Sequence, residues 1–565
     1  MTFSRRSSRL GLRGLFEMAA VRSRTRRAAA GLSAVALVGL LFAMTSGSTS
    51  AVAASAHAGA VSSQQLVIDT QFDSPAGDPN NNSSIVNYYM LGLVYDTLLT
   101  YTPNAQGKYD LANPQPWLAT SYTANPNDTV FTFQLRKNAV FSDGTPVTSK
   151  DVVFSLLRVT NLQGAPSFVG ACFKKVTAPS TYTVKITTNA PCPGLPSDLT
   201  TKSAGIVNSA VVIKHGGTDA PNAAKTDKAG SYFNTHSLGS GPYTLQSFSP
   251  TGQTVLLRNP KFWGPAPFYQ KLVYENVTPN IARLNVLDGQ AQVAIGLSAD
   301  QTSTLASSPA VQVVSAPSST VFYLQANANA KVSSVAANPN FWQALRYAIN
   351  YPDLDNLVGA GTVQACGVVP AVAFGALPTS DCVHRNLTRA KHYASLLHLG
   401  GQTLELEFPT EFSLDGASFA TVAEALQGYL QAAGIKTVLK GTPLATWLPR
   451  WEKGIQELNV GALAPSYIDP SQMLAYAPNG YRGQYAGMTA KSLPKLQQAA
   501  TAASLAVGTA ARKQAYAKYQ AVLNDGSPII SLFDPVVTVV AAKNVRGLTI
   551  NPEYVLDPAQ LSSSS

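Results

Sequence analysis

The chain has 565 residues, 45% hydrophobic and 9% aromatic, enough to bury the cores of about three average domains and too apolar for a disordered protein. Charged residues make up only 13%, about half the usual share, which suits an exported protein. The formal charge of +11 is concentrated in residues 1–60, which hold eight of the 41 basic and one of the 30 acidic residues. The remaining 33 basic and 29 acidic residues give no sign of nucleic-acid binding.

Residues 1–60 have the layout of a signal peptide. A basic stretch at 22–27 is followed by a predominantly apolar stretch at 28–44 and by small-residue cleavage sites at 51–58. We expect a signal peptide or an N-terminal anchor, and a protein of the periplasm or the extracellular cell surface. The first Cys is Cys172, so a lipoprotein is not expected. Whether the leader is cleaved or retained stays open.

The first predicted elements after the leader are a strand at 64–70 and a helix at 85–100. Residues 131–157 then predict a strand, a turn and a helix in close succession. Apolar and polar residues alternate from 131 to 136, the pattern of a strand with one buried face. Asp143 precedes a Gly in a turn signal, and Thr148 with Asp151 forms a helix capping box. The two acids are therefore interpreted as turn and cap residues, not catalytic ones.

Helices and strands continue to alternate through the rest of the chain, which predicts an α/β protein with mixed sheets. A polar segment at 220–236 is interpreted as a loop, and Pro352 is expected to stop the helix before it. The remaining expected strands are 181–188, 254–258, 293–296, 321–324, 435–439, 528–533 and 536–541, and the remaining expected helices are 281–287, 341–350, 419–433 and 510–523.

The four cysteines form two local pairs, Cys172 with Cys192 and Cys366 with Cys382. Three connectivities are possible, and the exported context with the short spacings favours the sequential one. The spacing within each pair does not fit a zinc site.

No motif of a known catalytic or cofactor site is present: the sequence lacks a Walker loop, an HExxH helix, an EF-hand loop and a GxSxG elbow. His392 and His398 are six residues apart and would not share a helix face. We therefore expect no enzyme activity, no cofactor and no metal site.

Several segments, in the same order, resemble the extracellular solute-binding proteins of family 5, which serve peptide and nickel ABC importers. The segments are YDTL (95–98), WLATSY (117–122), FTFQLRKNAVFSDGTPVTSKDVVFSL (131–156), GSGPY (239–243), LRNPKFWG (257–264), FWQALRYAIN (341–350), AEALQGYLQAAGI (423–435) and SPIISLFDPVV (527–537). The resemblance spans residues 64–550, nearly all of the chain after the leader.

The resemblance implies a two-lobed periplasmic-binding-protein-like fold of the large class, with a hinge that closes the lobes on a ligand. Lobe one would comprise residues 61–318, including an extra subdomain, and lobe two residues 319–529. Residues 530–565 would return to lobe one.

The implied function is the substrate-binding component of an ABC importer. It would capture a peptide or a similar medium-sized organic solute and deliver it, as a monomer, to the membrane permease and its ATPase. The alternatives are a secreted hydrolase on the same scaffold and a receptor for a peptide signal without transport. Which solute is bound stays open.

The resemblance also implies where the ligand binds. In peptide-binding members an Asp three residues before an acid-Pro pair holds the ligand's amino group, and this position is Ser466 here. A neutral hydroxyl cannot make the stronger charge-assisted hydrogen bond, which puts peptide binding in doubt. A pocket aromatic 22 positions earlier falls at Leu444, with Trp447 nearby. The other expected ligand-binding residues are Ile85, Tyr88, Phe168, Ala464 and Tyr467.

Each of these aromatic positions has an alternative interpretation. Tyr88, Phe168 and Tyr467 could equally pack in the core or between the lobes. Asp469, in the acid-Pro pair, is interpreted as a turn or helix-cap acid. Trp447 and Trp451 are at helical spacing, so we expect one of them to face the core.

Overall fold

A computed structural model describes residues 64–72, 77–82, 85–104, 107–249, 252–397, 399–410 and 412–564, with backbone only for residues 85 and 86. All of them belong to one compact unit, residues 63–565. The predicted leader and His398 lie outside the described residues. None of the helices in the described ranges combines the length and the apolar character needed to span a membrane.

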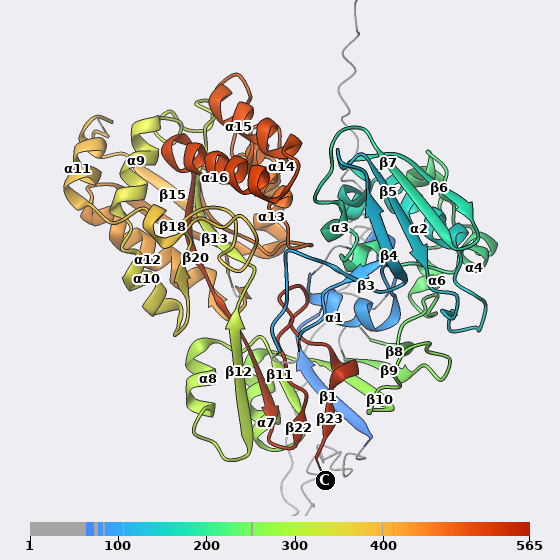
Figure 1. The fold of residues 1–565 in the computed structure, drawn as a ribbon. Coiled ribbons are helices and arrows are strands. Elements are labelled where there is room, and N and C mark those ends of the chain that lie inside the picture. Colours follow the sequence, from blue (N-terminus) through green and yellow to red (C-terminus); the bar gives the residue numbers. More distant parts are fainter. Residues whose placement is uncertain are drawn as a thin grey trace, which may run out of the picture. The chain divides into compact units, whose positions relative to one another are not determined.

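A seven-stranded mixed sheet is built around the buried strand QLVIDT (Figure 1). This strand pairs in parallel with both of its neighbours, and the outer strands add antiparallel pairs. The strand order is β12 (Val311–Pro317), β21 (Val536–Ala542), β11 (Val293–Ile295), β1 (Gln65–Thr70), β10 (Lys271–Asn276), β9 (Gln253–Arg258) and β8 (Tyr243–Phe248). Helix α1 (Ile85–Val94) belongs to the core on one face and α7 (Pro279–Leu287) to the core on the other.

A four-stranded antiparallel sheet with one long helix forms the predicted extra subdomain. Its strand order is β4 (Ala119–Ala124), β5 (Val130–Leu135), β7 (Thr183–Thr188) and β6 (Phe173–Ser180), and α2 (Ser149–Asn161) packs on it. The capping box is present, because Thr148 N and Oγ1 donate to Asp151 Oδ2 at 2.9 and 2.7 Å. Asp143 Oδ1 accepts from Thr145 N at 2.8 Å inside the turn. Both acids are scaffold residues, as interpreted.

A six-stranded mixed sheet occupies the second half of the chain (Figure 1). Its strand order is β14 (Val363–Gln364), β20 (Ile529–Asp534), β13 (Val321–Ala326), β19 (Leu458–Leu463), β15 (Thr403–Thr410) and β18 (Lys436–Pro443). Its cores include residues of α9 (Pro339–Ala348), α12 (Phe419–Ala432), α15 (Pro494–Leu505) and α16 (Thr509–Gly526). We call this sheet with its helices the second lobe, and the seven- and four-stranded sheets with theirs the first lobe.

The remaining elements are short. The short helices are α3 (Leu195–Asp198), α4 (Ser209–Lys214), α5 (Ala223–Thr226), α6 (Gly230–Phe233), α8 (Ala299–Leu305), α10 (Tyr351–Val358), α11 (Leu387–Ser395), α13 (Leu444–Glu452) and α14 (Tyr481–Tyr485). Three two-stranded pairs join β2 (Leu99–Thr100) to β3 (Gln115–Pro116), β16 (Ser413–Leu414) to β17 (Ala417–Ser418) and β22 (Val545–Arg546) to β23 (Ser562–Ser563). The 3-10 turns are at 79–81, 165–170, 202–204, 379–381, 470–476 and 558–560.

The chain passes between the lobes at two adjacent points. Residues 318–320 join β12 to β13, and Pro535 joins β20 to β21, with Ser318 N donating to Pro535 O at 2.9 Å. The return to lobe one was predicted at residue 530, but β20 pairs with β13 and is entirely buried in the second lobe. Asp415, from the β16–β17 turn, accepts hydrogen bonds from Ser318 Oγ and Thr320 Oγ1, both at 2.6 Å, and so fixes the first crossing.

Three predicted elements differ in the structure. The helix predicted at 85–100 ends at residue 94, because Asp96 turns inward to accept bonds from Trp117 Nε1, Ser240 Oγ and Trp263 Nε1 at 2.6–2.9 Å. The loop predicted at 220–236 contains two helical turns, α5 and α6. Pro352 does not merely end a helix. It lies in the first turn of α10, where backbone N–H groups make no hydrogen bond within the helix, so the lack of an N–H in Pro costs nothing there.

Both cysteine pairs form disulfides, Cys172 with Cys192 and Cys366 with Cys382. This is the sequential pairing. The first links the start of β6 to the segment after β7, and the second closes a segment of the second lobe that contains a 3-10 turn at 379–381. Each disulfide therefore links the two ends of one local segment within a single lobe.

Candidate ligand-binding site

Tyr88 lies on α1 of the first lobe and is fully buried. Its hydroxyl is hydrogen-bonded to Thr201 Oγ1 at 3.0 Å and to Ser203 Oγ at 2.7 Å. Burial raises the pKa of the Tyr88 phenol, while hydrogen bonds from Ser203, Thr201 and the Ser466 hydroxyl oppose that rise. Ser466 follows β19 in the second lobe. The Tyr88 hydroxyl of the first lobe and the Ser466 hydroxyl of the second lobe therefore lie near each other.

A second contact between the lobes is aromatic. The rings of Phe168, in the 3-10 turn 165–170 of the first lobe, and Tyr467 stack with their centroids 5.9 Å apart and their planes 29° apart. Tyr467 is fixed on its own side, because its N–H donates to Gln472 Oε1 at 3.1 Å and its hydroxyl lies 3.2 Å from Ser471 Oγ. Four expected ligand-binding residues thus form two touching pairs.

Asp469 is a cap residue, as interpreted from the sequence. It caps the 3-10 turn 470–476, and its Oδ1 accepts from Ser471 N at 2.9 Å. Arg512 Nη2, from α16, lies 2.7 Å from each of its two oxygens. This carboxylate is therefore already neutralised within the second lobe.

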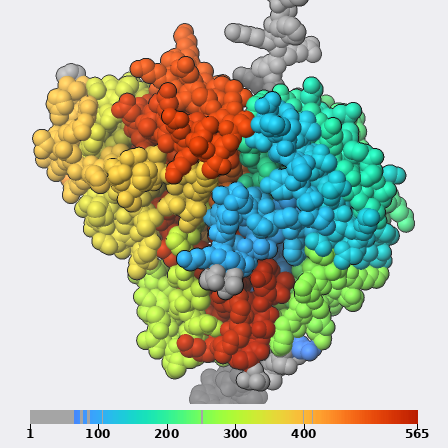
Figure 2. All heavy atoms as spheres, viewed as in Figure 1, coloured from blue at the N-terminus to red at the C-terminus, as the bar shows by residue number. Residues whose placement is uncertain are grey.

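The short helix α3 of the first lobe faces the same turn. A methyl group added at Gly194, which precedes α3, would lie 2.5 Å from Ser471 Oγ and 2.9 Å from Asp469 Oδ1. On the face drawn in Figure 2, orange atoms of the second lobe lie against blue atoms of the first lobe. Leu111 of the first lobe shares one core cluster with Met473 and Tyr476 of this turn. The lobes are in direct contact here.

Asp198, the last residue of α3, is a member of this region that the sequence did not suggest. It is 7% exposed, and none of the described residues hydrogen-bonds to its Oδ1. Burial and, secondarily, the neighbouring Asp469 raise its pKa well above the usual value. In sequence it stands in a short polar stretch, LPSDLT, which reads as an ordinary loop, so no local signal marks it.

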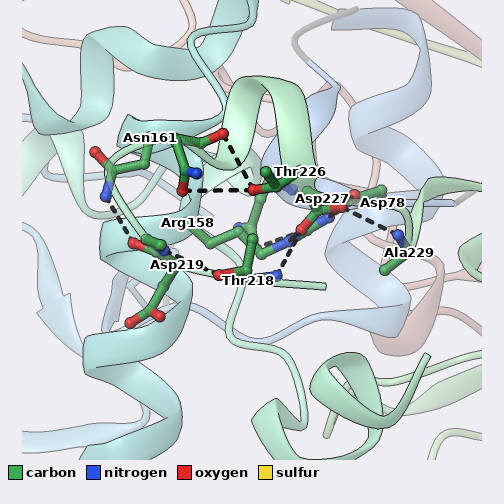
Figure 3. A network of polar contacts seen from close by, with 11 residues as sticks. Asp78, Arg158, Asn161, Thr218, Asp219, Thr226, Asp227 and Ala229 are labelled. Atoms are coloured by element: carbon green, nitrogen blue, oxygen red, sulfur yellow. Dashed lines mark hydrogen bonds and ion pairs between the residues drawn. The ribbon is translucent and has the colours of Figure 1, made fainter. Parts of the chain in front are cut away.

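The first-lobe face that holds Tyr88 is positioned by a buried ion network (Figure 3). Arg158 of α2 pairs with Asp78 at 2.6 Å and with Asp227 at 2.8 Å, and all three side chains are buried. Asp78 in turn accepts from Asn80 N, whose side chain donates to the carbonyls of Ser203 and Gly205 at 3.1 and 3.2 Å. The network thus fixes the 203–205 segment against which the Tyr88 hydroxyl rests.

Leu444 and Trp447 lie on α13, which packs on β15 and β18 of the second lobe. Leu444 is half-buried. The expectation that only one of Trp447 and Trp451 faces the core is wrong. Both are buried, because their rings stack on each other with centroids 5.5 Å apart. Trp451 Nε1 donates to Gln325 Oε1 at 3.2 Å.

Ile85 and Ala464 are the other two residues expected to bind the ligand. Ile85 begins α1, but its side chain is outside the described part of the structure. Ala464 is half-buried, two residues before Ser466. Over the described ranges, no three His, Cys, Asp or Glu side chains come together as metal ligands. His215 and His236 instead stack on the Tyr232 ring, at 3.6 and 3.9 Å between centroids.

Residues 113–484 match the bacterial extracellular solute-binding proteins, family 5 (middle region). The chain belongs to this family. The family assignment and the two-lobed fold expected from the sequence are therefore confirmed.

Individual family 5 proteins are similar over most or half of the chain. The probable D,D-dipeptide-binding periplasmic protein DdpA of Escherichia coli is 28% identical, over 88% of this chain and 93% of its own length. The Escherichia coli glutathione-binding protein GsiB is 28% identical, over 45% of this chain and 47% of its own. The structure of Helicobacter pylori DppA in complex with the peptide STSA superimposes with a TM-score of 0.73 at 19% identity, covering 89% of this chain and 98% of that one.

In this family 5 protein the two inter-lobe contacts bring together four of the eight expected site residues: Tyr88, Ser466, Phe168 and Tyr467. Leu444 and Trp447 belong to a separate second-lobe helix. The residues that sequence reasoning missed, Gly194 and Asp198, come from the first-lobe helix that packs against the same second-lobe turn.

Proposed function

We propose that this protein is the solute-binding component of an ABC importer, and that it captures a short peptide or peptide-like solute between its lobes. It works outside the cytoplasm as a monomer and hands the solute to a membrane permease driven by an ATPase. It is not an enzyme. Ligand specificity lies where the lobes meet, between the 85–94 helix, the 165–170 turn and α3 on one side and residues 464–471 on the other.

The observation that carries the proposal is the pair of inter-lobe contacts, Tyr88 with Ser466 and Phe168 with Tyr467. Each pairs a first-lobe side chain with a second-lobe side chain at an expected ligand-binding position. When the lobes part, the hydroxyl groups can hydrogen-bond to polar groups of a solute, and the aromatic rings can pack against its apolar groups. The peptide-related ligands named for DdpA, GsiB and DppA agree with a peptide or peptide-like solute.

The closing motion would act at the two crossings, residues 318–320 and Pro535. Because these two short segments join the lobes' sheets in the described part of the chain, a rotation there separates the lobes while each sheet keeps its hydrogen bonds. Hydrogen bonds keep the two crossings side by side. Ser318 N donates to Pro535 O, and Asp415 accepts from Ser318 and Thr320.

Thermal-shift and calorimetric screening of the protein tests this function. The panel holds L- and D,D-dipeptides, tri- to pentapeptides, glutathione, amino sugars and neutral oligosaccharides. Since a ligand that binds only the folded state raises its apparent stability, we expect a peptide-class compound to raise the melting temperature. Binding of sugars alone would contradict the peptide assignment, and no binding at all would contradict the receptor role. Mass spectra of the recovered ligand should show it intact, whereas cleavage would favour the hydrolase alternative.

A further inference from the structure

Asp198 is a buried carboxylate without a cationic partner at the meeting point of the lobes. It is 7% exposed, and no described residue hydrogen-bonds to its Oδ1. Asp198 lies near the second lobe: beside the larger effect of burial, the charge of Asp469 raises the pKa of Asp198, and the charge of Asp198 raises the pKa of the Tyr467 phenol. The preceding turn of α3 touches Asp469 and Ser471 through Gly194.

The cations nearest to this region are engaged elsewhere. Arg512 is held by both oxygens of Asp469 at 2.7 Å. Lys202, four residues after Asp198, lies 3.5 Å from Glu553 and over the Tyr554 ring at 4.5 Å. Ser466, on the facing lobe, is neutral. The first lobe therefore presents a carboxylate to the second lobe that no side chain of the described residues neutralises.

An ionised carboxylate that is removed from water without a partner is strongly destabilising. Closure of the lobes without a ligand imposes this cost on an ionised Asp198 or makes the carboxyl take up a proton, whereas closure around a cation stabilises the ionised form. The same carboxylate can thus recognise a cation and bias the lobes to close only when that cation is present.

We propose that Asp198 binds a cationic group of the ligand, an ammonium or a guanidinium, from the first lobe. This inference rests on the proposed function and names the chemical class of its solute: a peptide or peptide-like compound with a free amine or guanidine. Asp198 is then the residue that selects for charge, and the Phe168–Tyr467 pair lies beside it to accept the apolar part of the ligand.

Isothermal titration calorimetry with trialanine and N-acetyl-trialanine tests this assignment at neutral pH. The proteins are wild type, Asp198→Asn and, as control, Asp300→Asn, which removes an exposed acid in the first turn of α8. We expect wild type and Asp300→Asn to bind trialanine at least 10-fold more tightly than the acetylated peptide. Asp198→Asn should bind trialanine 10- to 100-fold more weakly than wild type does and lose the discrimination, since hydrogen bonds to charged groups are the stronger ones.

The failure of this inference differs from the failure of the proposed function. If wild type binds the peptides but Asp198→Asn keeps the preference for trialanine, Asp198 is not the cation site. If wild type binds no peptide, putrescine and agmatine serve as cationic probes, and equal binding or no binding to wild type and Asp198→Asn overturns the assignment. The ligand-free melting temperature is a second readout: Asp198→Asn should raise it relative to Asp300→Asn, and a decrease would show that the carboxylate is a structural partner instead.

Discussion

Phe168 and Tyr467 stack with 5.9 Å between their ring centroids, and so join a turn of the four-stranded subdomain to the segment that follows β19 in the other lobe. Phe168→Ala should weaken ligand binding by about 2- to 10-fold, because the ligand would lose its contact with the Phe168 ring. This fold-change corresponds to the free energy of one aromatic pair. Calorimetry with the ligand found by screening measures this. Phe268→Ala is the matched control, since Phe268 is an exposed aromatic that lies edge-to-face with the Tyr269 ring. Equal effects of the two variants would place the ligand away from Phe168.

Gly194 provides a test of closure that leaves the fold intact. Gly194→Ala should lower ligand affinity, because the added methyl group meets Ser471 Oγ and Asp469 Oδ1 only when the lobes are together, and Arg512 holds Asp469 in place. The backbone of Gly194 has a helical conformation that Ala adopts freely. Gly230→Ala is the control, since nothing lies within 4 Å of the added carbon there. Melting temperatures of the ligand-free variants should match within error; unchanged affinity for Gly194→Ala would show that α3 does not approach the second lobe on binding.

Ser466→Asp should raise the affinity for ligands with a free amino group by about 10-fold, because it adds a carboxylate on the second-lobe side of the contact with Tyr88. Ser466→Asn, similar in size and neutral, is the control. N-acetylated peptides should gain nothing from either change. In the Asp198→Asn background, Ser466→Asp should restore part of the lost affinity for trialanine. If neither background responds, residue 466 does not contact the ligand's amine.

Arg158 should be essential for stability. Arg158→Ala removes a buried cation that pairs with Asp78 and Asp227 and leaves two uncompensated carboxylates, so we expect the free energy of unfolding to fall by about 3–5 kcal/mol. Glu405→Ala is the control, because the Lys440–Glu405 pair has a similar distance, 2.6 Å, but is 36% and 45% exposed, and such pairs contribute about 0–1 kcal/mol. Lys440 keeps its contact with the buried Glu407 in this variant. Urea unfolding measures both. A similar loss in the two variants would mean that burial does not set the strength of these pairs.

Asp534 should make stability depend on pH. Burial raises its pKa from 3.8 to about 7, so the folded protein binds a proton that the unfolded chain releases. This proton stabilises the fold at low pH, and the stabilisation is lost as pH rises from about 4 through about 7. Asp534→Asn, which can still accept from Ala371 N, should therefore match wild type near pH 4 and be more stable by about 2–4 kcal/mol at pH 8.

Denaturation curves at pH 4, 6 and 8 test this expectation. Asp300→Asn, which removes an exposed acid, should show a constant offset from wild type at all three values. An Asp534→Asn variant that is less stable than wild type at pH 8 would show that the carboxylate is ionised and needed there.

The local elements and the family could be predicted from the sequence alone. The strand, turn and capped helix at 131–157 form as predicted. The turn and the cap are held by hydrogen bonds between residues two or three positions apart, such as Thr148 to Asp151, and the alternation of buried and less buried residues marks the strand. The ordered motifs identified the two-lobed fold for a related reason, since each records a local packing requirement. The helix predicted at 85–100 ended early because Asp96 bonds to Trp117, Ser240 and Trp263, and three such distant partners leave no local pattern.

The side chains that meet between the lobes could not be predicted from the sequence, because they come from segments that the folded chain brings together. Ser466 was placed in the site by its motif, but its contact with Tyr88 depends on how two sheets are brought together. Asp198 acquires its character solely from burial against the second lobe and from the engagement of Arg512 and Lys202 with other acids. A carboxylate's partner, or its lack of one, is a property of the folded surroundings, and for this reason the sequence could not reveal the cation site.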